Sequence, residues 1–361
     1  MRLHNSHIGH TAHAQQQPPR GGGGVQGGQP AAARAPQDTF QGQSSQAAYQ
    51  QISGALAGDP AAQQALRQML ASGKLDGRMM DQLGRLAQPG GDTALLGQVV
   101  KDVANPGSIR QGRGNQFCAA TTALSDLAAG NPAEYARMAA DLRLTGQSRT
   151  AGGQTIRAQG GSPQGMTATQ QLMAPALTEQ ANGRRYDVNN QGVSHAANPR
   201  HAPHGERRLN GTVGRGMERM QEMLQGGNFE TLYIPGRGEG GGRGKHGKGG
   251  GGQAGQVGNA AGQAQNVIAR SVAGGQQASV SADGHWYRVT GASGGQLTLQ
   301  DQATGQSSTV NARQFLRGAE AVTFAGGAGQ VGKNFRKPGN DEDEGGHGGG
   351  RGSLTPPEDA L

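Results

Sequence analysis

The chain has 361 residues, of which 67 are glycine and 33% are hydrophobic, and its formal net charge is +8. So little apolar sequence predicts one modest domain interrupted by disordered segments. The single cysteine, Cys118, excludes an internal disulfide framework and a cysteine-rich zinc site. We expect no Sec signal peptide and no membrane span, since no stretch reaches roughly 18 apolar residues. This favours a cytoplasmic protein or one exported by a specialised bacterial secretion system.

The N-terminal third divides into two parts. Residues 1–45 are predicted to be a disordered, low-complexity leader. Residues 46–104 place apolar side chains at intervals of three and four residues, with Gly, Pro or Asp between the runs. This pattern predicts four short helices, at 47–56, 61–70, 78–86 and 93–103.

Residues 105–235 are predicted to form a helical lobe that contains Cys118. Asn131 followed by Pro132 is typical of a helix start, and Pro175 is expected to bend a later helix. The predicted helices are 119–129, 133–144, 166–182 and 212–224, followed by a β-rich segment at 228–234.

Residues 236–260 form a Gly/Arg/Lys-rich segment that is predicted to be a flexible insertion, because it has too little apolar area to offset the entropy of ordering. Its cations resemble an RG-type nucleic-acid tract, but no aromatic residue accompanies them. We therefore expect at most weak, salt-sensitive contacts with anionic partners. The residues concerned are Arg237, Arg243, Lys245 and Lys248.

Residues 261–327 are predicted to form a β-rich lobe, after one helix at 264–272, and residues 328–361 a disordered tail. Alternating apolar residues between Gly-containing turns indicate a β meander. The expected strands are 278–282, 285–290, 296–300, 307–310 and 321–324. The sequence thus predicts an α+β fold, with a helical lobe packed on an antiparallel sheet.

Cys118 lies where a Gly-rich loop turns into an alanine-rich helix. The positive end of the helix dipole and the unpaired N–H groups of the first turn favour a thiolate there. A nucleophilic thiol also needs a base and a third group that orients the base. His285 opens one predicted strand and Asp301 ends the next, so a hairpin would bring them together. Asn311 is the alternative third residue.

Several motifs together resemble the papain-like cysteine peptidases, and most of all uncharacterised bacterial members with a Gln-containing loop ahead of the cysteine. These motifs are Ile109-Arg-Gln-Gly-Arg-Gly-Asn-Gln-Phe-Cys118, Asn131-Pro-Ala-Glu-Tyr135, Gly284-His285 and Asp301-x-Ala-Thr-Gly305. The resemblance implies a papain-like fold, with Cys118 as nucleophile, His285 as base and Asp301 as its orienting partner. It also implies that Gln111, rather than Gln116, helps to form the oxyanion hole with the backbone N–H of Cys118.

The chain departs from the best-known members of this group. The Gly-Ser-Cys-Trp surroundings are absent, the third residue is Asp rather than Asn, and the insertion lengthens the interval between Cys118 and His285. The resemblance implies a peptide or protein substrate, but a related acyl transfer, such as that of transglutaminases or deamidases, stays open. No cofactor is expected.

Three alternative interpretations assign no catalytic chemistry. Cys118 could be a small buried residue without chemistry, and Asp301 could serve only its turn. The whole chain could be a non-catalytic, Gly-rich secreted interaction protein. Two groups of histidines could capture a metal, although they lack neighbouring carboxylates or thiols, so we expect no specific metal site. These groups are His4, His7, His10 and His13, and His195, His201 and His204.

Overall fold

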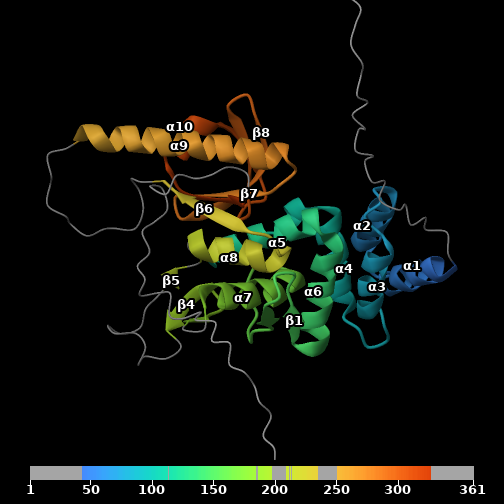
Figure 1. Cartoon of the computed structure of the whole chain (residues 1–361). Coiled ribbons are helices and arrows are strands. Elements are labelled where there is room, and N and C mark those ends of the chain that lie inside the picture. Colours follow the sequence, from blue (N-terminus) through green and yellow to red (C-terminus); the bar gives the residue numbers. More distant parts are fainter. Residues whose placement is uncertain are drawn as a thin grey trace, which may run out of the picture. The chain divides into compact units, whose positions relative to one another are not determined.

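The computed structural model describes residues 43–112, 114–183, 186–196, 209–210, 212, 214–234 and 250–326 (Figure 1). All of them belong to one unit, which begins at Thr39. The helices are α1 Gln43–Ala55, α2 Pro60–Ala71, α3 Gly77–Leu86, α4 Thr93–Ala104, the 3-10 helix η1 Pro106–Ser108, α5 Cys118–Gly130, α6 Pro132–Thr145, α7 Ala168–Asn182, α8 Gly214–Gln225, α9 Gly250–Ala273 and α10 Ala312–Leu316. The strands are β1 Gln147–Arg149, β2 Thr155–Arg157, β3 Tyr186–Val188, β4 Val193–Ala196, β5 Leu209–Asn210, β6 Phe229–Tyr233, β7 Ala278–Ala282, β8 His285–Ser293, β9 Gln296–Asp301, β10 Ser307–Asn311 and β11 Ala319–Ala325.

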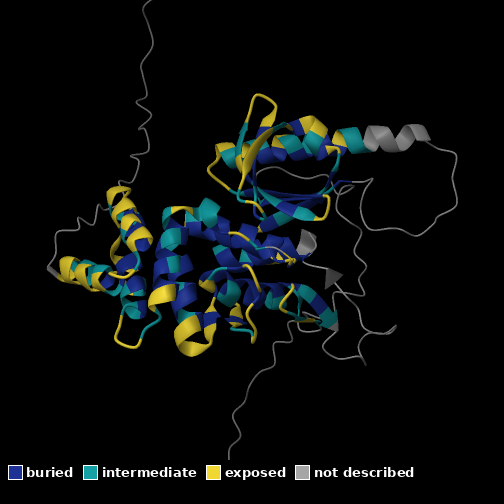
Figure 2. Cartoon of the chain, turned by 180° about the vertical axis from the view of Figure 1, so that it is seen from behind, coloured by how far each residue is buried: buried dark blue, intermediate teal, exposed yellow. Residues whose placement is uncertain are grey.

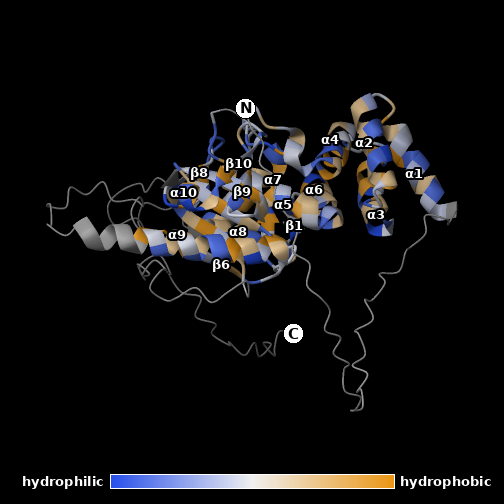
Figure 3. Ribbon diagram, turned by 90° about the horizontal axis from the view of Figure 1, so that it is seen from above, coloured by the Kyte–Doolittle hydropathy of each residue, from blue (hydrophilic) through white to orange (hydrophobic). Residues whose placement is uncertain are grey.

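Local sequence signals start the helices of the first part. Asp59, Asp76 and Asp92 are N-caps, and each carboxylate accepts a backbone N–H of the first turn at 3.0, 2.8 and 2.9 Å respectively. Apolar residues recur at intervals of three and four along these helices (Figure 3), and the large ones that face the core, such as Leu66, Leu83 and Leu96, are buried. Caps and periodicity together explain why α2, α3 and α4 begin within one residue of the positions predicted from sequence.

The main sheet is antiparallel, with strand order β10-β9-β8-β7-β11-β6. It lies between two helical layers, with α9 and α10 on one face and α5 and α8 on the other (Figure 1). The first face forms a separate small core that includes Ile268 of α9 and Val322 of β11. The second face joins the large helical core through Trp286 and Ala321. The α+β prediction, a helical region packed on an antiparallel sheet, is therefore confirmed.

Helix α5, which begins with Cys118, is deeply enclosed. Every residue from Cys118 to Ala128 is buried (Figure 2). Its alanines allow α6, α7 and α8 to approach closely, and its other face contacts β8. The helix that begins with the cysteine is therefore fixed by packing on all sides.

Some sequence predictions need correction. Helix α9 begins at Gly250, inside the segment 236–260 that was expected to be a flexible insertion, so this part of the expectation was wrong. The sequence did not predict helix α10 or the small sheets β1-β2 and β3-β4-β5, whose short strands lack clear alternation. The leader up to residue 42, the tail from residue 327 and the cations Arg237, Arg243, Lys245 and Lys248 lie outside the described residues.

A membrane-spanning helix was not expected. Within the described ranges, no helix has the length and apolar character to cross a bilayer.

A buried ion pair joins the helical layer to the sheet. Arg288 of β8 donates from Nε to Asp126 Oδ1 of α5 at 2.6 Å, and the Asp126 side chain is only 1% exposed. Gln221 of α8 donates to the other oxygen at 2.8 Å, and Gln277 donates to the Asp126 carbonyl at 2.8 Å. Burial raises the pKa of Asp126, and the charge and hydrogen bond of Arg288 counteract this effect. We call these four residues the interlayer clamp.

The clamp leads to a first prediction. Arg288→Met leaves a buried carboxylate without its charge partner, which costs about 3–5 kcal/mol in the free energy of unfolding. Arg143→Met serves as the control, because Arg143 pairs with Asp92 at 2.8 Å but its side chain is 54% exposed. That pair is expected to contribute less than about 1 kcal/mol. Urea unfolding measures both, and equal losses would contradict the role assigned to the clamp.

Candidate functional site

Cys118 is the first residue of α5, as the sequence predicted, and it is 7% exposed. The N-cap is Phe117, whose side chain makes no capping hydrogen bond. The N-cap residue therefore offers no side-chain acceptor to the backbone N–H groups of the first turn. Instead, the backbone N–H groups of Trp286, Ala119 and Cys118 itself interact with the thiol and lower its pKa.

The protonation of the thiol differs from the expectation. Burial raises the pKa of Cys118, and the charge of Asp301 raises it further, whereas the three backbone N–H groups lower it without overcoming the burial. The favoured thiolate that the helix N-terminus suggested is therefore not the resting state. A neutral, buried thiol needs a base that removes its proton during attack.

His285 and Asp301 are brought together by the β8–β9 hairpin. The register pairs Tyr287 with Asp301, and His285 Nε2 lies 2.8 Å from Asp301 Oδ1. The His285 ring also packs edge-on against Tyr287, with ring centroids 4.9 Å apart. Because Nε2 faces the carboxylate, Nδ1 is the ring nitrogen left for other chemistry.

Asp301 is held as an anion. Burial raises its pKa, but the Ala303 N–H, the His285 charge and the Thr304 hydroxyl together lower it below the ordinary value. Ala303 N lies 2.7 Å from Oδ1 and Thr304 Oγ1 lies 3.0 Å from Oδ2. Asp301 therefore does serve its turn, as one reading of the sequence predicted. The same turn also holds the carboxylate that contacts the imidazole.

Trp286 connects the cysteine to the histidine. It directly follows His285 on β8, and its backbone N–H reaches the Cys118 thiol. Its side chain is buried and donates from Nε1 to the Thr212 carbonyl at 3.0 Å. Within the described residues, no hydrogen bond joins the thiol to the His285 ring itself.

Gln111 lies in the loop before α5. Its backbone N–H donates to the Gln302 carbonyl at 3.0 Å, and its Nε2 donates to the Asn115 carbonyl at 3.3 Å. Asn115 returns a hydrogen bond from Nδ2 to the Gln111 carbonyl, and its Oδ1 accepts the Phe117 N–H at 3.2 Å. The loop that precedes the cysteine is therefore held by side-chain amides, which the sequence did not reveal.

Glycines let two segments pack closely against this loop. Gly112 has φ +77°, and a Cβ there would lie 2.4 Å from the Gly165 carbonyl oxygen. Gly192, in the β3–β4 turn, also has φ +77°, and a Cβ there would lie 2.8 Å from the Gln116 carbonyl carbon. Gln116 donates its backbone N–H to the Gln191 carbonyl at 2.6 Å. The β3–β4 turn thus lies directly against the residues before Cys118.

The remaining candidates lie elsewhere or serve structure. Asn311 caps α10, accepting the Gln314 N–H at 3.0 Å, so Asp301 and not Asn311 contacts His285. His195 lies on β4 beside Asn189, with 3.3 Å between side-chain nitrogens, while the other histidines considered as metal ligands are outside the described residues. Among the residues that the structure describes, no group of three His, Cys, Asp or Glu side chains is placed to hold a metal ion.

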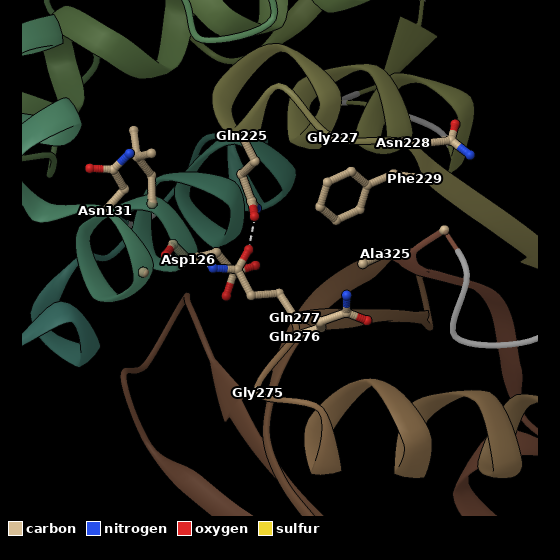
Figure 4. A pocket seen from close by; sticks show the side chains of 13 residues that line it. Asp126, Asn131, Gln225, Gly227, Asn228, Phe229, Gly275, Gln276, Gln277 and Ala325 are labelled. Carbon is tan, nitrogen blue, oxygen red and sulfur yellow. Dashed lines mark hydrogen bonds between the residues drawn. The ribbon is translucent and has the colours of Figure 1, made fainter. Parts of the chain in front are cut away.

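A pocket of about 400 Å³ lies at the opposite end of α5 (Figure 4). Gln225 and Gln277 meet within it through a side-chain hydrogen bond, and Asp126 of the clamp also lines it. Cys118 and His285 do not line this pocket. Asp126, the lining residue of α5 that is nearest to the cysteine in sequence, lies eight residues after Cys118, which is about 12 Å along the helix. The pocket is therefore distinct from the cysteine site.

Gly192→Ala tests the packing of the turn. Alanine at positive φ costs about 1–2 kcal/mol, and here its methyl group would also overlap the Gln116 backbone. We expect a larger loss of stability than in Gly146→Ala, which has φ +73° but open space around it. Since Cys118 is the only cysteine, its rate of reaction with a disulfide reagent measures how accessible it is. We expect this rate to rise in Gly192→Ala and to equal that of wild type in Gly146→Ala. Equal rates in the two variants would contradict the packing.

Asp301→Asn tests the depressed pKa of Asp301. A carboxylate with a lowered folded pKa stabilises the folded chain at pH values above its unfolded pKa, and this stabilisation is lost as the pH falls through the folded pKa. The difference in unfolding free energy between wild type and Asp301→Asn should therefore shrink as the pH falls from about 6 to about 3. Urea unfolding at each pH measures it, and a difference independent of pH would show that the charge of Asp301 is not stabilised.

The chain matches no protein-family model, no curated protein and no solved structure. The arrangement of Cys118, His285 and Asp301 must therefore be interpreted from its own geometry.

Proposed function

We propose that this protein is a thiol hydrolase of papain-like architecture that acts on an amide or ester carbonyl through a Cys118 thioester. One observation carries the proposal. The strand that presents the His285–Asp301 pair also hydrogen bonds, through the next residue, to the thiol at the start of a buried helix. The residues proposed as nucleophile, base and orienting carboxylate thus come from one helix and one hairpin, which are far apart in sequence.

The proposed first step is attack of the Cys118 sulfur on the carbonyl carbon, while His285 Nδ1 takes the thiol proton. Asp301 fixes the tautomer that leaves Nδ1 free and stabilises the imidazolium that forms. The tetrahedral oxyanion would be held by the backbone N–H of Cys118 and by Gln111 Nε2. The raised pKa of the thiol fits this order of events, because the proton leaves only when the base and the carbonyl are in place.

The tetrahedral intermediate then collapses. The bond to the leaving amine or alcohol breaks, and the imidazolium returns its proton to that group. Water or another nucleophile, deprotonated by the neutral His285, attacks the thioester and regenerates the thiol. The expected substrate is a peptide or protein, and transfer to an acceptor other than water would make the same site an acyltransferase.

The proposal predicts that p-nitrophenyl acetate acylates Cys118. Release of nitrophenolate and the mass of one acetyl group on the Cys118 peptide measure the reaction. Cys118→Ala should abolish it, and His285→Ala should slow it about 100-fold or more, which is the range for loss of a general base. His195→Ala is the control for loss of an imidazole and should stay within about twofold of wild type. An unchanged rate in His285→Ala would refute the mechanism.

A further inference from the structure

Three glutamines near the site have buried amide atoms without a hydrogen-bond partner among the described residues. Gln302 is fully buried, and neither its Oε1 nor its Nε2 has a partner. Gln111 Oε1 and Gln300 Oε1 are also buried and unpartnered. A buried polar group that is left unsatisfied destabilises the folded chain. Several such unsatisfied amide atoms gather at the end of β9, beside Asp301, and packing alone does not explain them.

Two of these groups are complementary and lie on neighbouring residues. Gln302 Nε2 is a donor and Gln111 Oε1 is an acceptor. The backbone hydrogen bond from Gln111 N to Gln302 O, 3.0 Å long, holds the two residues side by side. Gln300 does not share this arrangement, because its Nε2 donates to the Gly107 carbonyl at 3.3 Å.

We propose that Gln302 is a positioning residue for the oxyanion hole, donating from Nε2 to Gln111 Oε1 in the reacting enzyme. This inference rests on the proposed function and adds a residue to it. Gln111 Nε2 carries two N–H groups, and one of them already points to the Asn115 carbonyl. With Oε1 held by Gln302, the plane of the amide is fixed and the second N–H is left for the oxyanion.

The orientation of the Gln111 amide matters for the chemistry. Rotation of the amide by half a turn would exchange its donor and acceptor ends. An acceptor oxygen would then face the developing negative charge and would repel it. A fixed donor requires no reorganisation when charge develops, which is the main source of oxyanion stabilisation. A partner on Oε1 prevents this rotation, and Gln302 is buried next to Gln111 with its amide otherwise unused.

The experiment compares two reactions of Cys118. Acylation by p-nitrophenyl acetate passes through an oxyanion, whereas alkylation by iodoacetamide does not. Gln302→Met keeps the length of the side chain and removes the donor. We expect it to slow acylation about 10-fold and to leave alkylation within about twofold, since losing a whole oxyanion donor costs about 100-fold or more. Gln111→Ala should show that larger loss, and the double variant should be no slower than Gln111→Ala.

Gln300→Met is the matched control, because it removes a buried glutamine two residues away on the same segment. Its ratio of acylation to alkylation should equal that of wild type. If Gln302→Met does not fold, Gln302→Asn retains a buried amide that is too short to reach, and the same pattern is expected. Equal slowing of both reactions by the Gln302 variant, or additive losses in the double variant, would overturn the inference. Absence of acylation in the wild type would instead refute the proposed function.

Discussion

The clamp between Asp126 and Arg288 is the interaction on which the arrangement of the site depends. Asp126 lies eight residues after Cys118 on α5, and Arg288 lies three residues after His285 on β8. Their contact of 2.6 Å thus links the two elements that carry the cysteine and the histidine. Gln221 and Gln277 satisfy the remaining carboxylate and carbonyl acceptors, and together with Arg288 they offset part of the desolvation, which still raises the pKa of Asp126. Helix and strand cannot slide past one another without exposing this charge to an apolar surrounding.

The high glycine content has two different meanings in this chain. In the segment ahead of residue 250 it predicts too little apolar area for a core. Around the cysteine loop, by contrast, Gly112 and Gly192 permit backbone contacts that no side chain would allow. The same residue type thus predicts little core in one segment and allows close packing in another. Composition alone cannot separate the two, because the difference lies in which backbone comes to lie beside the glycine.

In the proposed function, burial of the thiol and orientation of the base depend on each other. A buried thiol with a raised pKa is protected from indiscriminate oxidation and alkylation, since the thiolate is the reactive form. Such a thiol is useful only with a base oriented toward it. The hydrogen bond between His285 and Asp301, reinforced by the turn that ends β9, fixes the imidazole ring of the proposed base.

The sequence by itself determined the positions of most of the helices and of the β meander, because apolar periodicity, Asp and Asn caps and Gly turns are local signals. It also pointed to Cys118, His285 and Asp301, since hairpin neighbours follow from strand order. Only the tertiary structure revealed the Trp286 N–H at the thiol and the buried amides of Gln111 and Gln302, and only it decided the protonation of the cysteine. Backbone donors, partner choice and desolvation depend on what packs against a residue, and no local pattern encodes that.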